Sequence, residues 1–142
     1  MSWTEIYIHL VFSTKDHIPY LYSESLRKTV FSHIHQNSKL KDIRMDCVNG
    51  FTDHAHCLLS LGREQTLSKV AQLIKGESSY WINKNSFIRE KFIWQDDYWA
   101  VSVSRSHLQN VRTYIYRQEQ HHYKKTFKAE LEELFNKYNS GD

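Results

Sequence analysis

The chain has 142 residues, the size of one domain with a hydrophobic core of its own. Four Gly, one Pro and an aromatic content of 14% exclude a disordered or low-complexity protein. The net charge of +3 permits a polyanionic partner without requiring one, and no apolar run approaches the length of a membrane span.

The first half of the chain predicts a strand, a helix and a pair of strands. Residues 6–12 are a β-rich run that we interpret as a central strand. Ser23 or Ser25 is the expected N-cap of the helix, in which apolar residues recur every four positions. A second strand over residues 44–49, a turn at Asn49-Gly50 and a third strand over residues 54–61 should follow as antiparallel neighbours.

The next elements are a helix, a strand and another helix. Thr66 is the expected N-cap of a helix with Gly76 in its middle, and that glycine indicates either a kink or the close approach of another backbone. Residues 99–104 alternate as a strand does. Ser106 is the expected N-cap of a helix that runs from residue 107 to about residue 122.

Thr126 should begin a last helix, a C-terminal tail over about residues 126–138. The order strand, helix, strand, strand, helix, strand is that of a split β-α-β unit. We therefore expect an α+β fold of the ferredoxin-like or RRM-like kind, with residues 1–142 forming a single domain. It should contain an antiparallel sheet of about four strands with helices on one face, and extra C-terminal helices. The third strand should be central.

Cys47 and Cys57 both fall in predicted strands with apolar neighbours, so we expect reduced thiols in the core. No N-terminal signal is visible in the first residues. Together with the absence of an apolar span, these observations predict a cytoplasmic protein with no membrane partner.

Two histidines stand at the start of the third strand. Residues two apart on a strand point to the same face, so His54 and His56 can aim two imidazoles at one metal ion. His33 and His35 have the same spacing but lie in a predicted helix, where they diverge by roughly 200°. The first pair is therefore the candidate metal site, and a purely structural role for it is the alternative.

The helix predicted over residues 107–122 offers further functional groups. Tyr114, Gln118 and His121 fall at i, i+4 and i+7 and share one face. Gln118 offers an oxygen and His121 a nitrogen as a third ligand, and Tyr114 offers a phenol one turn away. Tyr116 lies about 200° around the helix from Tyr114 and cannot serve the same site. The alternative is an amphipathic helix whose tyrosine only packs.

In combination these features resemble the single-tyrosine HUH transposases of the insertion-sequence 200/605 type, which include the REP-associated tyrosine transposases. The resemblance rests on the histidine-apolar-histidine strand, the tyrosine-x-x-x-glutamine helix and the trailing His121-His122. Further matches cover nearly the whole chain and include residues 9–15, 53–56, 73–76, 94–95 and 102–104, with Phe127 and Glu130 near the end.

The resemblance implies that Tyr114 is a nucleophile and that His54, His56 and Gln118 hold Mg²⁺ or Mn²⁺. It implies cleavage and rejoining of single-stranded DNA at hairpin-bearing element ends, through a 5′-phosphotyrosine intermediate. It also implies a homodimer in which the helix that carries Tyr114 in one subunit can complete the histidine site of the other. Whether His121 replaces or joins Gln118 as a ligand stays open.

Basic residues supply candidate phosphate contacts for such a substrate. They are Lys69, Lys75, Lys84, Arg105 and Arg112. For each residue alone, a solvated surface role is the alternative. Two other functions compete with strand transfer: a non-catalytic, domesticated nucleic-acid-binding module on the same fold, and a small metal hydrolase that uses an activated water.

Overall fold

The structure is a computed structural model that describes residues 2–119 and 126–139. Its strands and helices follow one another in the order β1 (Tyr7–Ser13), α1 (Glu24–Leu40), β2 (Arg44–Phe51), β3 (His54–Ser60), α2 (Leu67–Lys84), β4 (Trp99–Val103), α3 (Leu108–Tyr116) and α5 (Phe127–Asn139). Two short 3-10 helices, Lys15–His17 and Arg105–His107, precede α1 and α3.

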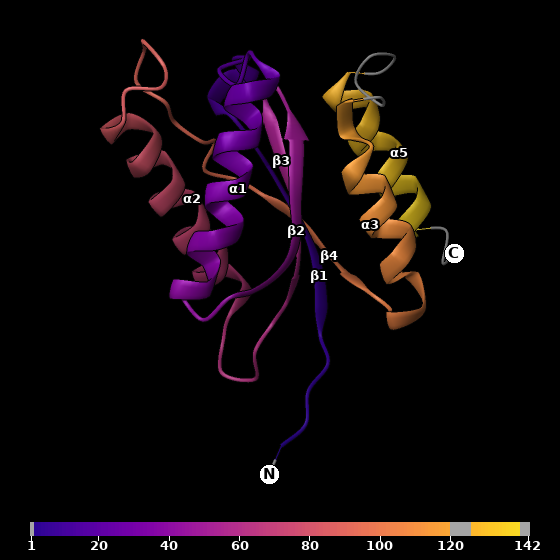
Figure 1. Ribbon diagram of the computed structural model, residues 1–142. Helices are drawn as coiled ribbons and strands as arrows, with labels where there is room; N and C mark the ends of the chain where they lie inside the picture. The colour runs from indigo at the N-terminus through magenta and orange to yellow at the C-terminus, as the bar shows by residue number, and fades with distance from the viewer. Residues whose placement is uncertain (1, 120–125, 140–142) are drawn as a thin grey trace.

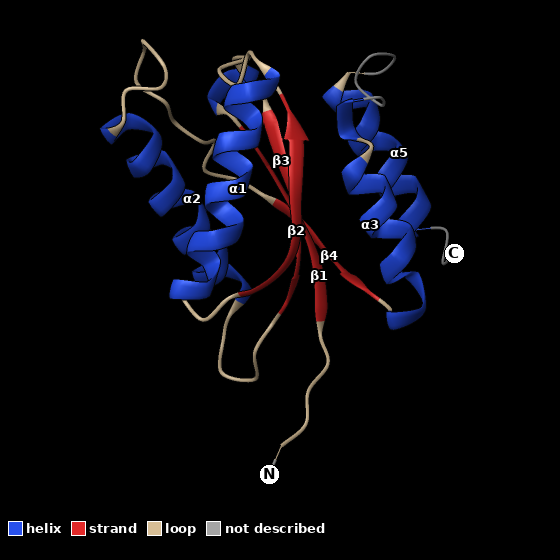
Figure 2. Cartoon of the chain, viewed as in Figure 1, coloured by secondary structure: helices blue, strands red, loops and turns tan. Residues whose placement is uncertain are grey.

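The four strands form one antiparallel sheet in the order β2-β3-β1-β4. Helices α1 and α2 cover one face of this sheet, and α3 and α5 cover the other, as Figure 1 shows with the sheet seen edge-on. In Figure 2 the strands form a red layer between the two pairs of blue helices. The split β-α-β arrangement, with additional helices after β4, confirms the predicted α+β fold.

The central strands β1 and β3 are buried on both faces. Beneath α1 and α2 their alternate residues form the apolar core: Ile8, Leu10, Phe12, Ala55, Cys57 and Leu59. Burying each such aliphatic or aromatic side chain stabilises the fold by about 1.5–3 kcal/mol. On the opposite face the same alternation places His9, His54 and His56, which are fully buried as well. The two-residue period of a strand thus separates the hydrophobic core from a polar cluster.

The turn between β2 and β3 lies elsewhere than predicted. β2 continues through Gly50 to Phe51, which pairs with His54, and the connection is Thr52-Asp53. A Cβ atom on Gly50 would collide with the His54 carbonyl oxygen and lie 2.9 Å from both the Ala55 Cα and the Phe31 ring of α1. Gly50 therefore serves close packing within the sheet rather than the turn.

Three of the predicted helix starts are confirmed. The Ser23 hydroxyl accepts a hydrogen bond from the Leu26 amide, Thr66 accepts from the Lys69 amide, and Thr126 accepts from the Ala129 amide. The prediction for Gly76 is wrong, since α2 runs through it as one helix, and among the described residues a Cβ there would meet no atom within 4 Å beyond its own stretch of helix.

The helix predicted over residues 107–122 is also different in the structure. Ser106 lies inside a 3-10 helix instead of capping α3, and His107 precedes the first α-helical residue. α3 ends at Tyr116, and the chain turns at Arg117 before becoming helical again at Gln118. His121 and His122 lie outside the described residues.

The two cysteines agree with the prediction that they are reduced core residues. Cys47 and Cys57 are free and buried. Within residues 2–119 and 126–139, no helix is both long enough and apolar enough to cross a membrane.

Candidate metal centre and tyrosine

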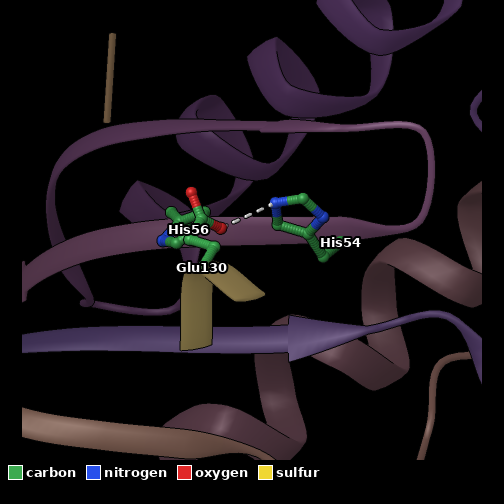
Figure 3. A group of neighbouring side chains, drawn as sticks. All are labelled: His54, His56 and Glu130. Carbon is green, nitrogen blue, oxygen red and sulfur yellow. Dashed lines mark hydrogen bonds and ion pairs between the residues drawn. The ribbon is translucent and has the colours of Figure 1, made fainter. Parts of the chain in front are cut away.

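β3 directs its two histidines toward α5, where each meets the same carboxylate. Glu130 Oε1 lies 3.0 Å from His56 Nε2 and 3.3 Å from His54 Nε2. In Figure 3 a dashed line joins the Glu130 carboxylate to the His54 imidazole. The two histidines are fully buried and Glu130 is 2% exposed. Ala55 points into the opposite core, as strand alternation requires.

These three side chains fit a divalent cation. One potential ligand atom from each of them lies within 4.8 Å of the other two. Two imidazole nitrogens and a carboxylate oxygen are a common donor set for divalent transition metals. A carboxylate is also costly to bury unless cationic or hydrogen-bonding partners surround it. The chemistry of the residues is therefore compatible with a bound divalent transition metal such as Mn²⁺, whereas Mg²⁺ prefers oxygen ligands.

Glu130 is the site residue to which the sequence reasoning assigned no role. It matched the resembling family, but its partner His56 lies 74 residues away along the chain. One signal was present in the sequence. Glu130 precedes Leu134 by one helical turn, and both are buried, so a carboxylate stands on the apolar face of α5.

Gln118 approaches the same centre. Its side chain is fully buried, and its Oε1 lies 3.1 Å from His54 Nε2. It reaches this position although α3 ends two residues earlier. Its neighbour Glu119 is ion-paired with Arg27 of α1 at 2.8 Å. The amide oxygen of Gln118 thus adds a possible fourth donor to the group.

The C-terminal end of α3 is held on the sheet by Asn49 of β2. The Asn49 Nδ2 donates hydrogen bonds to the carbonyl oxygens of Ile115 at 3.0 Å and Tyr116 at 3.3 Å. The last carbonyl groups of a helix have no partner within the helix, so this side chain satisfies two of them. Asn49 fixes the position of Tyr114, one residue earlier.

Tyr114 stands beside the histidines of its own chain. Its ring centroid lies 5.6 Å from that of His56 and 6.2 Å from that of His9. Burial raises the pKa of the Tyr114 phenol above its ordinary value, and the negative charge of Glu130 raises it further, while the Gln118 side chain acts in the opposite direction. The structure therefore brings Tyr114, Gln118 and both histidines together within one subunit.

The other ring nitrogen of each histidine faces a different partner. His54 Nδ1 lies 2.8 Å from the carboxylate of Asp53, and His56 Nδ1 lies 2.9 Å from His9 Nε2. Burial lowers the pKa of His54, but the hydrogen bonds and negative charges of Asp53 and Glu130 outweigh it and raise the pKa above its ordinary value. Burial and the neighbouring His56 lower the pKa of His9.

The three lysines predicted to contact DNA, Lys69, Lys75 and Lys84, are on α2, which covers the face of the sheet opposite α3 and α5 (Figure 1). Lys69 is exposed. Lys75 is half-buried, and its Nζ donates to the carbonyl oxygens of Asp96 at 2.7 Å and Asp97 at 3.4 Å. Burial lowers the pKa of Lys75. Its ammonium group is thus engaged by the segment that precedes β4.

The two predicted arginines are both ion-paired. Arg105 is exposed and its Nε lies 3.3 Å from Glu5. Arg112 of α3 makes a bidentate pair with Asp46 of β2, with Nε–Oδ1 and NH2–Oδ2 distances of 3.0 and 2.7 Å. The structure does not gather the five predicted basic residues into one patch, because α2, which carries the lysines, and α3, which carries Arg112, lie on opposite faces of the sheet.

Comparison with known proteins identifies the fold and the family. A family model described as IS200-like transposase matches residues 2–118. The crystal structure of a candidate transposase from Deinococcus radiodurans R1 is similar, with a TM-score of 0.66 and 16% identity over 82% of this chain and 93% of that one. A REP-associated tyrosine transposase bound to a REP hairpin is also similar, with a TM-score of 0.63 and 15% identity over 86% and 72% of the two chains.

The comparison with curated protein sequences gives no match. At the identities of the two solved structures, their likeness shows a shared fold. The family model carries more weight, because it spans most of the chain and includes His54, His56, Tyr114 and Gln118. These matches confirm the resemblance drawn from the sequence, and the chain therefore belongs to the family of IS200-like transposases.

Proposed function

We propose that this transposase cleaves and rejoins single-stranded DNA at hairpin-bearing element ends, in a metal-dependent reaction with a 5′-phosphotyrosine intermediate on Tyr114. One observation carries the proposal: the phenol of Tyr114 and the donors of His54, His56, Gln118 and Glu130 converge in one buried cluster. A solved structure of similar fold is that of a REP-associated tyrosine transposase bound to a REP hairpin, which supports hairpin DNA as the substrate class.

In the proposed reaction the phenolic oxygen of Tyr114 attacks the phosphorus of a phosphodiester. A bond forms between that oxygen and phosphorus, and the bond from phosphorus to the 3′ oxygen breaks. The phenol proton is lost, and the leaving 3′ oxygen gains one to become a hydroxyl group. Because the covalent link preserves the phosphodiester energy, the reverse attack by a 3′-hydroxyl rejoins the strand without a nucleotide cofactor.

His54, His56, Glu130 and Gln118 would hold the divalent cation. When bound, a cation of this kind neutralises charge that develops on the phosphate oxygens and orients the phosphate for in-line attack. Burial and the Glu130 carboxylate raise the pKa of the Tyr114 phenol, so the surrounding side chains favour its protonated form.

A homodimer remains a prediction. The residues proposed for catalysis come from β3, α3, the residues just after α3, and α5 of the same chain. Sharing of the tyrosine helix between two subunits is therefore not required to assemble the site, although a dimer can still form through other surfaces.

The test uses a hairpin-bearing single strand that carries a fluorophore at its 3′ end, incubated with the protein and Mn²⁺. We expect a fluorescent protein band that resists denaturation, because the 5′ phosphate of the labelled fragment stays covalently bound to Tyr114. Tyr114→Phe should give no such band. Tyr116→Phe is the matched control, since Tyr116 is on the same helix but 66% exposed, and it should form the adduct as the wild type does.

Other outcomes distinguish the competing functions. Cleavage by Tyr114→Phe would identify water as the nucleophile and favour the metal hydrolase. Tight binding of hairpins without cleavage of any of them by the wild type would favour the non-catalytic binding module.

A further inference from the structure

His9 of β1 occupies a position beside the candidate metal centre that the proposed reaction does not use. Its side chain is fully buried, and its Nε2 lies 2.9 Å from His56 Nδ1. The ring centroids of His9 and His56 are 5.1 Å apart. In the β1–β3 register Val11 pairs with His56 and His9 pairs with Leu58, so the two histidines are diagonal neighbours on one face.

The two proposed ligand histidines are supported in the same way. Each turns Nε2 toward Glu130, and each has a partner at Nδ1: Asp53 for His54 and His9 for His56. A neutral imidazole carries one N–H. When Nε2 gives its lone pair to a cation, the proton must be on Nδ1, where Asp53 or His9 offers the buried N–H an acceptor. A neutral His9 that accepts at Nε2 carries its own proton on Nδ1, and this N–H meets no hydrogen-bond partner among the described residues.

We infer that His9 is a positioning residue whose Nε2 accepts the hydrogen bond from His56 Nδ1–H and so keeps His56 Nε2 available to the cation. This inference rests on the metal site proposed above. It assigns to His9 the role toward His56 that the Asp53 carboxylate has toward His54. An imidazole acceptor is neutral, whereas a carboxylate in its place would add a second buried negative charge beside Glu130.

The surroundings of His9 fix its ring. The indole of Trp99 from β4 meets it edge-on, with centroids 5.5 Å apart and an interplanar angle of 89°. The phenol of Tyr114 meets it at 6.2 Å and 71°. With these aromatic neighbours and the backbone of a central strand, His9 has little freedom to turn away from His56. The same ring therefore contacts a proposed ligand and the proposed nucleophile.

Two substitutions separate the hydrogen bond from the aromatic packing. His9→Phe keeps a ring against Trp99 and Tyr114 but removes the acceptor. His9→Gln removes the ring but places an amide oxygen near the position of Nε2. The readout is the affinity for Mn²⁺ in the absence of DNA, measured by electron paramagnetic resonance, with thermal unfolding as a check on folding. We expect about a 10–100-fold loss of affinity in His9→Phe, the usual effect of removing such a support, and a much smaller loss in His9→Gln.

The outcomes for His9 and for the metal site are distinct. If the wild type binds Mn²⁺ and folded His9→Phe binds it equally well, the role of His9 is overturned while the metal site stands. A His9→Gln protein as weak as His9→Phe would also overturn it, because a restored hydrogen-bond acceptor would then not restore the affinity for Mn²⁺. Failure of the wild type to bind Mn²⁺ would instead refute the metal site.

A spectroscopic measurement on the unmodified sequence does not depend on how well the variants fold. In ¹⁵N-labelled wild-type protein loaded with diamagnetic Zn²⁺, the proton of His56 should be on Nδ1. A scalar coupling across the hydrogen bond should connect this nitrogen to His9 Nε2. Absence of that coupling, or a proton on Nε2 of His56, would overturn the inference.

Discussion

Adding one methyl group at each of two glycines should have opposite effects on stability. At Gly50 the new Cβ would collide with the His54 carbonyl oxygen and lie 2.9 Å from the Ala55 Cα, both backbone atoms of a central strand that cannot yield cheaply. Overpacking of this kind costs typically about 1–3 kcal/mol, and we expect the upper end. At Gly76 a Cβ meets nothing within 4 Å, and replacing glycine by alanine within a helix stabilises it by about 0.5–1 kcal/mol.

Urea unfolding followed by tryptophan fluorescence measures both effects. Gly50→Ala should unfold at lower urea than the wild type and Gly76→Ala at higher urea, with a separation of about 3.5–4 kcal/mol between the two variants. That is a large part of the roughly 5–15 kcal/mol that stabilises a typical domain. A Gly50→Ala protein as stable as the wild type would refute the close packing of β2 against β3 and α1.

Three further predictions concern the buried polar cluster and the thiols. Glu130→Gln keeps the shape of the side chain but removes its charge. Calorimetry should show an affinity for Mn²⁺ that is lower by at least about tenfold. An unchanged affinity would mean that Glu130 is not a ligand. The pKa of His54 is raised, so its imidazole stays protonated up to a higher pH, and this proton competes with the cation. The affinity for Mn²⁺ should therefore be higher at about pH 8 than at about pH 6. An affinity that does not change with pH would contradict this. Burial and the neighbouring Asp46 raise the pKa of the Cys47 thiol to about 12, and burial raises the pKa of the Cys57 thiol. Ellman's reagent should therefore modify both thiols only as fast as the protein unfolds. Rapid labelling of the native protein would disprove their burial.

Patterns within single elements predicted most of the fold. The caps at Ser23 and Thr66 and the alternation around His54 and His56 are local features, and the structure agrees with them. The turn assigned to Asn49-Gly50 failed because an Asn-Gly pair is a typical hairpin signal, whereas this glycine is needed for the close approach of the His54 carbonyl oxygen, the Ala55 Cα and the Phe31 ring of α1. Packing within the sheet and against α1 overrode a local preference.

The candidate site was also predicted from local patterns, but only in part. The histidines, Tyr114 and Gln118 follow from strand and helix periodicity joined to a family resemblance. The break in the helix at Arg117 did not follow, and Gln118 reaches the cluster although the single long helix assumed from the sequence does not exist. Glu130 and His9 received no role because their importance depends on pairings 74 and 47 residues apart, which no short-range pattern reports.

The long sequence separation between the histidines of β3 and Glu130 of α5 decides when the candidate site can form during synthesis. The ribosome completes β1 and β3 well before α5, so a growing chain holds both histidines of β3 while the carboxylate that faces them has not yet been made. Contacts between such distant segments form late in folding. A product that ends before α5 lacks one of the groups proposed to hold the cation. Competence to cut DNA would then be reserved for finished molecules.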